Sequence, residues 1–446
     1  MKPVTRAIAM VCLVASVAGC KQHGQAYHNV FNDPLLFAKT VKQMNEVVMT
    51  NNFPPIIASR NYVYASIAAY EVMALGDHRF QTLAGQLNKF EPLPAFDTSG
   101  VNYQYASILA FLKLGEAVTF PAGSLGSFRK YLDSLQQVSG MDEQMATKTK
   151  ALADSVGNRI LAWSKKDNYA QTRTAEKYNI TQEEGRWVPT PPAYAQALEA
   201  HWNMIRPMVM DSCTQFVPPR PPAFNIKDTT SKYYQEVISI KRAVENLTPE
   251  QKHIADFWDD LGNRAIVEGH VMFVAKKFSP TGHWMNIIGI AAEKAGSDFS
   301  NTVYAYAKTS IAMFDAFIQC WDEKYRSNYA RPETIINKYI DPDWRPYLQT
   351  PPFPEYTCGH STVSAAAAES LTDIFGDNFA YTDTSELEFG IKSRSFPSFR
   401  AAAVENNWAR FYGGIHFHNS CIISTEYGQK VGRLVNNKIH FLKPSI

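Results

Sequence analysis

The segment 352–375 reads PFPEYTCGHSTVSAAAAESLTDIF and contains the clearest structural signal in this chain. The prolines in its first part exclude a helix interior there, because proline lacks the backbone donor and clashes with the preceding turn. From Thr362 to Phe375 the residues are mostly alanine and other helix formers, which predicts a helix. Gly359 before it permits a close backbone approach, and the free N–H groups of a helix start favour an anion. We expect His360 at this helix start, where an imidazole gives or takes a proton near neutral pH.

The same helical character extends along most of the chain. Apolar residues recur at the three-to-four spacing of one helical face from Pro34 to Asn51 and again from Pro55 to Leu75. Few runs show the alternating β-branched pattern of strands. Further helices are expected at 103–118, 124–138, 143–165, 249–262, 284–320, 361–375, 397–412 and 420–436. The sequence therefore predicts an all-α fold built of helical bundles.

Prolines interrupt this pattern between residues 187 and 224. The sequences WVPTPP (187–192) and VPPRPP (217–222) cannot lie inside a helix. Aromatic residues interspersed with them favour a strap packed on the body over a flexible linker. The strap ends an N-terminal helical lobe, 21–225, and the rest, 226–446, is a C-terminal helical domain. We expect the two lobes to pack together, with the functional site in the C-terminal bundle.

Residues 1–20 resemble a targeting signal and are excluded from the fold. Lys2 and Arg6 precede an apolar run, from Ala7 to Val17, that is too short to span a bilayer as a mature helix. The small residues before Cys20 resemble a bacterial lipobox, in which the cysteine is lipidated and becomes the new N-terminus. An ordinary signal peptide with an incidental cysteine is the alternative. We predict an exported protein, on the periplasmic or cell-surface face, that meets the membrane only through this lipid anchor.

The bulk composition excludes some classes of function. The chain has 446 residues, of which 45% are apolar and 19% charged, so it can bury a sizeable core. A net charge of +2 without a long basic tract gives no case for a nucleic-acid partner. Neither His283 nor the cysteines beyond the signal have neighbours at metal-ligand spacing, and no disulfide can be assigned. Those cysteines are Cys213, Cys320, Cys358 and Cys421.

Three short motifs in the last third of the chain carry the chemistry. The first places Lys324 and Arg331 seven residues apart, so a helix continuing through both would put two cations on one face. The second is the Gly-His pair before the helix described above. The third is RFYGGIH, in which two glycines break a helix between Arg410 and His416. Each motif alone has an ordinary structural interpretation, as a solvated surface or a helix cap.

Taken in this order, Lys-x6-Arg-Pro, Gly-His and Arg-x5-His resemble the three-part signature of the vanadium haloperoxidase and type-2 phosphatidic acid phosphatase superfamily. The surrounding sequences DAFIQCWDEKY (315–325), PFPEYTCGHS (352–361) and RFYGGIHF (410–417) are similar to its haloperoxidase-like branch. Upstream, YVYASIAAYE (62–71) and FWDD (257–260) extend the resemblance over most of the mature chain.

The resemblance implies a site for vanadate or a phosphoryl group, both of which are tetrahedral oxyanions. Lys324, Arg331 and Arg410 would neutralise the equatorial oxygens, and the Gly359 N–H would add a backbone donor. His416 would be the axial group, either as the ligand of vanadate in a peroxidase or as the nucleophile that forms a phosphohistidine in a phosphatase.

The resemblance also assigns the neighbouring side chains. His360 would be the acid–base group, and Trp321 and Phe353 are placed like the aromatic residues that line a halide site. Two positions depart from the family pattern. Cys358 stands where the family usually has serine, and a thiol is a weak donor that peroxide or hypohalite oxidises. Ser420 stands where the family commonly has an aspartate that orients the axial histidine.

The overall likeness and the long N-terminal lobe favour a vanadium haloperoxidase-like enzyme, which uses vanadate to oxidise halide with hydrogen peroxide. The first alternative is phosphomonoester hydrolysis through a phosphohistidine, which needs no cofactor. Cys358 favours this alternative, because no oxidant is generated. The second alternative is a catalytically impaired anion-binding lipoprotein. In both enzymatic interpretations the partners are small molecules, either halide and peroxide or a phosphomonoester.

Overall fold

The regular structure of this chain is almost entirely helical, so the predicted all-α fold is confirmed. The structure, a computed structural model, describes residues 26–261, 264–268, 270–274 and 276–444. The predicted signal segment and Cys20 lie outside the described residues. Among the described residues, no helix combines the length and hydrophobicity needed to span a membrane.

The helices of the first half of the chain precede or border the strap. They are α2 (Ala26–Phe31), α3 (Pro34–Thr50), α4 (Pro55–Gly76), α5 (Tyr103–Val118), α6 (Gly126–Val138), α7 (Glu143–Ser164), α8 (Tyr169–Thr174) and the short 3-10 helix η1 (Trp202–Met204). The second half contains α9 (Lys232–Glu245), α10 (Pro249–Phe257), α11 (Pro280–Lys294), α12 (Phe299–Ser327), α13 (Pro332–Tyr339), α14 (Gly359–Phe375), η2 (Ser385–Phe389), α15 (Phe399–Tyr412) and α16 (His418–Lys438).

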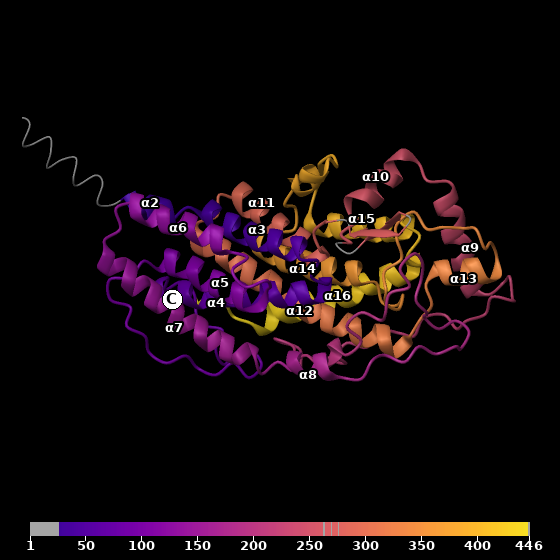
Figure 1. The fold of residues 1–446 in the computed structure, drawn as a ribbon, viewed down its shortest axis with the longest axis horizontal. Helices are drawn as coiled ribbons and strands as arrows, with labels where there is room; N and C mark the ends of the chain where they lie inside the picture. The colour runs from indigo at the N-terminus through magenta and orange to yellow at the C-terminus, as the bar shows by residue number, and fades with distance from the viewer. Residues whose placement is uncertain (1–25, 262–263, 269, 275, 445–446) are drawn as a thin grey trace, which may run out of the picture.

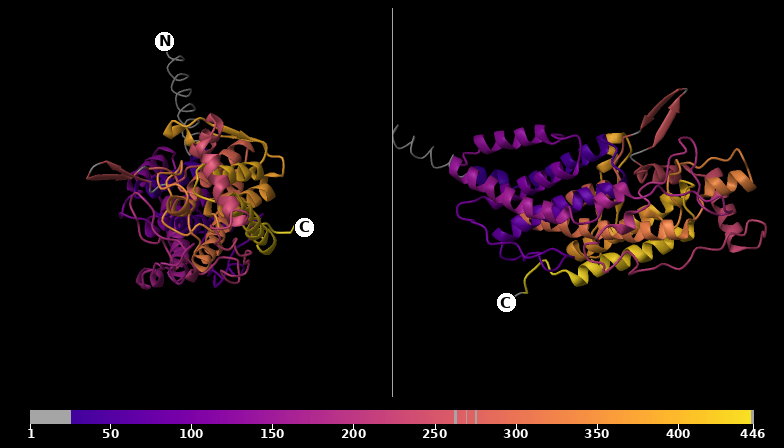
Figure 2. Two further views of the ribbon diagram at one scale, coloured as in Figure 1. Left: turned by 90° about the vertical axis from the view of Figure 1, so that its right-hand side faces the viewer. Right: turned by 60° about the horizontal axis from the view of Figure 1, so that its bottom comes forward.

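Two antiparallel hairpins are the only sheets in the part of the chain that the structure describes. They pair β1 (Ala265–Glu268) with β2 (Val271–Val274), and β3 (Tyr381–Asp383) with β4 (Arg394–Phe396). The β1–β2 hairpin projects from the helical body (Figure 2).

The predicted helix 284–320 is wrong as one unit, because it consists of the separate helices α11 and α12. The chain turns between them at Gly296, whose φ of +62° lies in the left-handed region that favours glycine. Asp298 then caps α12, since its side chain accepts a hydrogen bond from the Asn301 N–H at 2.7 Å.

The predicted helix 249–262 is also too long, because α10 ends at Phe257. The next residues turn toward the buried His283. The Trp258 ring stacks on it with 4.8 Å between the ring centroids, and Asp260 Oδ1 pairs with its Nδ1 at 2.9 Å. These tertiary contacts outweigh the local preference for one more helical turn.

Helix α12 forms the centre of the molecule. It is buried from Thr302 to Lys324 and packs against α3, α4, α11, α14 and α16. It runs along an elongated body, with α9 and α13 at one end and α2 at the other (Figure 1). The Phe441 ring near the C-terminus contacts Tyr70 of α4, so one hydrophobic cluster joins early and late parts of the chain. The division into lobes at residue 225 stays a prediction.

The proline-rich segment packs on the body as a strap. The Trp187 side chain is fully buried, and the backbone N–H of this residue donates to the Asn328 carbonyl at 3.1 Å. The Leu198 N–H donates to the Pro352 carbonyl at 3.0 Å. The strap therefore braces the two loops that carry the first and second sequence motifs.

Helices α14 and α16 approach each other unusually closely at Gly428. A Cβ atom on this residue would lie 2.1 Å from the Thr362 carbonyl oxygen. We expect Gly428→Ala to lower the free energy of unfolding by about 1–3 kcal/mol, because the helices must separate. Urea unfolding checks this, with Gly126→Ala as the control, since a Cβ there meets nothing within 4 Å. Equal stability of the two variants would contradict the close approach.

Candidate active site

The first motif does not form the continuous helix that the sequence predicts. Helix α12 ends at Ser327, and Asn328 has a φ of +47° in the left-handed region. Arg331 has extended backbone and directly precedes α13, where Pro332 is the first residue. The turn brings the Arg331 guanidinium back toward the loop that carries His416, instead of placing it two turns along a helix from Lys324.

Lys324 is fully buried and holds the loop before α14. Its Nζ donates to the carbonyls of Pro354 at 2.9 Å and Glu355 at 3.1 Å, and also to that of Thr357. Burial lowers the pKa of Lys324 to about 8. All three ammonium donors therefore contact backbone in this structure, and the lysine adds positive charge behind the loop. Its predicted contact with an oxyanion stays a prediction.

The ring of His416 has a defined proton position. Arg331 Nη1 lies 3.0 Å from Nε2, and a guanidinium only donates, so Nε2 carries the lone pair. Nδ1 therefore holds the proton and donates it to Glu355 Oε1 at 2.8 Å. This tautomer points the lone pair that an axial ligand or nucleophile needs toward Arg331. A group that bonds to Nε2 must displace the Arg331 contact.

Glu355 provides a carboxylate beside His416, although Ser420 stands where the family commonly has the orienting aspartate. Its Oε1 also accepts from the Phe417 N–H at 3.1 Å, and its Oε2 accepts from the Ser420 hydroxyl at 3.0 Å. Ser420 therefore holds the acid that orients His416 instead of being that acid. This fully buried glutamate comes from another loop and takes the place of the aspartate that the family commonly has.

Arg410 and His360 line the same cavity as His416. Arg410 lies in the last turn of α15, and its Nη1 donates to the Trp258 carbonyl. His360 lies in the first turn of α14. Burial and the Arg410 charge hold the pKa of His360 well below its usual range, so the ring is neutral near pH 7. A neutral imidazole here can accept a proton from a bound substrate.

A narrow cavity lies between these groups. The space open to the centre of a water molecule is about 20 Å³. The predicted aromatic pair lines it, with 4.9 Å between the ring centroids of Trp321 and Phe353. The complete lining consists of Pro55, Leu261, Pro280, Phe317, Trp321, Pro351, Phe353, Gly359, His360, Arg410, Ile415 and His416. The site therefore combines two histidines and an arginine with apolar walls.

Buried polar nitrogens without partners show what the cavity fits. Arg331 Nη2, Arg410 Nε and His360 Nε2 have no hydrogen-bond partner among the described residues. Buried polar groups are almost always paired, so such a cluster needs an explanation. A tetrahedral oxyanion bonded to Nε2 of His416 would satisfy it, and the first N–H groups of α14 add donors on the same side. The residues present therefore fit vanadate or phosphate.

Cys358, predicted beside the oxyanion, immediately precedes α14 and is fully buried. Its backbone N–H donates to Ser424 Oγ at 2.8 Å, which ties the start of α14 to α16. Burial opposes ionisation of the thiol, but its contacts with Cys421 and His416 hold the pKa of Cys358 well below its usual range.

A second buried cluster, which the sequence did not reveal, lies behind His360. His283 contacts Asp260 through Nδ1 and Asp383 through Nε2, each at 2.9 Å, and Glu386 Oε1 lies 3.9 Å from Nδ1. Asp260 Oδ2 in turn lies 3.9 Å from His360 Nε2, beyond hydrogen-bond range. The acids come from two separate segments, one with Asp260 and one with Asp383 and Glu386, so spacing in the sequence gave no signal for the cluster.

His283 should make stability depend on pH. Burial opposes the charged ring, but Asp260 and Asp383 raise the pKa of His283 well above its usual range. Since the unfolded pKa is about 6.5, the stabilising charge is complete below that pH and is lost as the pH rises through the folded pKa. We expect His283→Gln to cost about 3–5 kcal/mol near neutral pH and less in alkaline solution. Urea unfolding at several pH values checks this. A cost that does not change with pH would contradict a charged ring.

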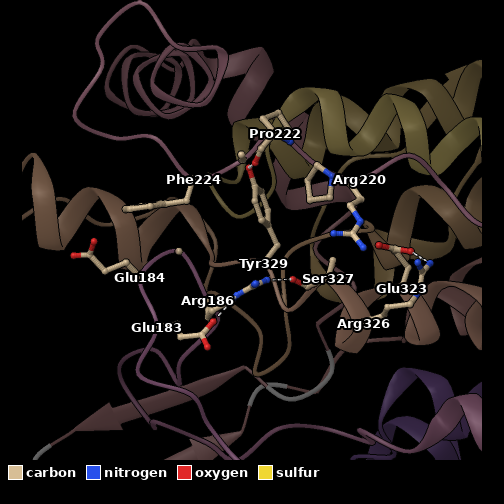
Figure 3. A pocket seen from close by; sticks show the side chains of 13 residues that line it. Glu183, Glu184, Arg186, Arg220, Pro222, Phe224, Glu323, Arg326, Ser327 and Tyr329 are labelled. Carbon is tan, nitrogen blue, oxygen red and sulfur yellow. Dashed lines mark hydrogen bonds and ion pairs between the residues drawn. The ribbon is translucent and has the colours of Figure 1, made fainter.

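A larger cavity, of about 420 Å³, lies where the strap meets the end of α12 (Figure 3). Four of its charged side chains form two ion pairs, Arg186 with Glu183 and Arg326 with Glu323. None of the predicted site residues lines it. Although this cavity is larger, its lining therefore excludes it as the candidate active site.

These observations define an all-α protein with a buried cavity, lined by two histidines and an arginine, in which one histidine is oriented by a carboxylate. The solved structure of a bacterial vanadium-dependent iodoperoxidase is 42% identical, with a TM-score of 0.86, and the match covers 92% of this chain and 97% of that chain. A bacterial vanadium-dependent chloroperoxidase in its holo form is 16% identical, with a TM-score of 0.62, and the match covers 86% of this chain and 92% of that chain. Residues 304–443 match the family described as the VCPO second helical-bundle domain. No curated protein matches the chain.

The chain belongs to the vanadium haloperoxidase family. It is therefore a haloperoxidase-like enzyme, and the resemblance stated from the three motifs is confirmed.

Proposed function

We propose that this chain holds vanadate at His416 and oxidises iodide with hydrogen peroxide. The observation that carries the proposal is the oriented Nε2 of His416, together with the unpaired buried nitrogens of Arg331, Arg410 and His360 at the same site. The iodide preference is supported by the 42% identity to an iodoperoxidase. Bound vanadate supplies the activation of peroxide for oxygen transfer to halide.

The protein's own groups bind, orient and move protons. Glu355 keeps the proton on Nδ1 of His416, so Nε2 stays available as a ligand. Arg331 and Arg410 donate to oxyanion oxygens and balance their charge. His360, neutral near pH 7, takes a proton from incoming peroxide and returns one when water leaves.

The walls of the cavity suit a large, weakly hydrated halide. Trp321 and Phe353 present ring faces and edges beside Phe317. Two cations lie over the Phe353 ring, with Lys324 Nζ 4.9 Å and the Arg331 guanidinium carbon 5.0 Å from its centroid. Iodide loses less hydration than chloride in such surroundings, and it is the more easily oxidised of the two. We therefore assign the halide to this aromatic side of the cavity.

The proposal is tested by halide oxidation with purified protein. The protein is freed of vanadate, reconstituted with orthovanadate and given peroxide with iodide, bromide or chloride. We expect vanadate-dependent formation of triiodide, with iodide faster than bromide. Phosphomonoester hydrolysis without halide oxidation would instead support the phosphohistidine alternative. Vanadate binding with neither activity would support an impaired anion-binding protein.

We further propose that the protein is exported and anchored to a bacterial membrane through Cys20. The support is the charged start, the short apolar run and the small residues before the cysteine. We expect Cys20→Ala to move the protein from the membrane fraction to the soluble fraction, because no lipid is then attached. Mass spectrometry of the N-terminal peptide checks the acyl chains directly. An unmodified Cys20 in membrane-bound protein would contradict the anchor.

A further inference from the structure

Three fully buried cysteines surround the start of α14. They are Cys320 on α12, Cys358 at the α14 cap and Cys421 on α16, and all three are free thiols. The side chains of Cys358 and Cys421 interact directly with each other. The Cys320 thiol is instead held at Thr357, whose hydroxyl lies 3.3 Å from the sulfur. Two of the three cysteines therefore form a close pair across two helices.

The helix packing fixes this pair in place. One turn beyond Cys421, Ser424 Oγ accepts the backbone N–H of Cys358 at 2.8 Å. Further along the same interface, Gly428 lets α16 approach the backbone of α14 at Thr362. A disulfide needs Cα atoms about 4.4–6.8 Å apart, which side chains in direct contact across closely packed helices can meet with little movement.

The pair lies beside the place where peroxide must bind. Cys358 directly precedes Gly359 and His360, which line the cavity, and its thiol contacts the ring of His416. The Cys421 thiol, on α16, also contacts Ser361. Cys358 does not line the cavity itself, but it adjoins the lining residues Gly359 and His360, so we expect an oxidant there to meet Cys358 before Cys421.

We propose that Cys358 and Cys421 are a peroxide-sensitive dithiol that closes to a disulfide and reversibly switches the site off. The oxidant is hydrogen peroxide, the substrate of the proposed function, and only this source of oxidant rests on that proposal. The Cys358 sulfur attacks peroxide, the O–O bond breaks, a sulfenic acid forms and water leaves. The Cys421 sulfur then attacks the Cys358 sulfur, the S–S bond forms, and the sulfenic oxygen leaves as a second water with the Cys421 proton.

The pair explains how a cysteine is tolerated at this position. An isolated Cys358 would proceed to sulfinic and sulfonic acids, which thiols do not reverse. Capture by Cys421 stops oxidation at the disulfide, which a thiol reductant reverses. While the disulfide exists, Cys358 is drawn toward α16 and the oxyanion loses the group at that position. Excess peroxide therefore limits the activity without destroying the enzyme.

The test is peptide mapping of the vanadate-free protein after treatment with hydrogen peroxide. We expect a cross-linked peptide that joins Cys358 to Cys421, with a mass loss of about 2 Da and two fewer free thiols, reversed by dithiothreitol. Because no halide is oxidised, this result is independent of the proposed function. Free thiols after treatment, or Cys358 recovered only as sulfinic or sulfonic acid, would overturn the inference.

Two single variants sharpen the test. Cys421→Ser should abolish the cross-link and leave Cys358 irreversibly oxidised, so vanadate binding does not return after reduction. Cys320→Ser, at another buried thiol beside the same loop, should keep the cross-link and its reversal. If Cys320→Ser also abolished the cross-link, or if Cys421→Ser recovered like the unmodified protein, the assigned pair would be wrong.

Discussion

His416→Ala is expected to lower kcat/KM for vanadate-dependent halide oxidation by about 10³-fold or more, with loss of vanadate binding. The reason is the lone pair on Nε2 of this ring. Among the described residues, it is the only nitrogen lone pair whose contacts place it against an arginine that has an unpaired donor. Alanine removes the nitrogen to which the oxyanion would bond. The two guanidinium groups and His360 then have no anchored oxyanion to contact. Stopped assays with iodide and equilibrium dialysis with vanadate measure the two effects separately.

The matched control is His418→Ala, two residues further along the chain. His418 stacks on Trp408 with 4.0 Å between the ring centroids and makes no contact with the cavity lining as described. We expect this variant to bind vanadate and turn over iodide like the unmodified protein. Equal losses in both variants would mean that the effect at residue 416 comes from folding rather than from ligation.

Glu355→Gln is expected to weaken vanadate affinity and activity by about 10–100-fold, the usual cost of removing the carboxylate behind a ligating histidine. Glutamine keeps the size of the side chain but removes the charge that stabilises the Nδ1 proton. Its amide must also satisfy the donors of His416, Phe417 and Ser420 with one oxygen instead of two. Titration with vanadate and steady-state kinetics at fixed vanadate measure the two losses.

A second buried glutamate provides the control for Glu355→Gln. Glu71 is 1% exposed and accepts from the Thr82 hydroxyl and from the Leu83 N–H at 2.7 Å, without any contact to the residues that line the cavity. We expect Glu71→Gln to change stability and leave vanadate affinity intact. An unchanged affinity in Glu355→Gln would show that the carboxylate does not orient His416.

Local sequence patterns predicted the helices correctly where tertiary packing favours the same conformation. The ranges 34–51 and 103–118 correspond to α3 and α5 because apolar spacing and caps act over a few residues. The prediction of one helix over 284–320 is wrong because the chain turns at Gly296, which has a positive φ. The helices on both sides of this turn are rich in apolar residues, so the sequence pattern does not separate them. The sequence shows the glycine but not the tertiary contacts that make it a turn.

The sequence predicts those residues of the candidate site that lie together in short motifs. Arg410 and His416 are close in the chain, so two glycines between them were enough to suggest that they meet. Glu355 lies 61 residues before His416, and Asp383 lies 100 residues after His283. No periodicity relates such positions, so the orienting carboxylate and the buried acid cluster emerge only when the helices pack.

The central claim is that vanadate binds at Nε2 of His416 within the two-arginine pocket. The most direct test is a crystal structure of the protein reconstituted with orthovanadate, with vanadium located by its anomalous signal. We predict vanadium bonded to His416 Nε2, with Arg331 and Arg410 on its oxygens and Nδ1 still donating to Glu355. Vanadium ordered at another position, with Arg331 still donating to Nε2, would contradict the account.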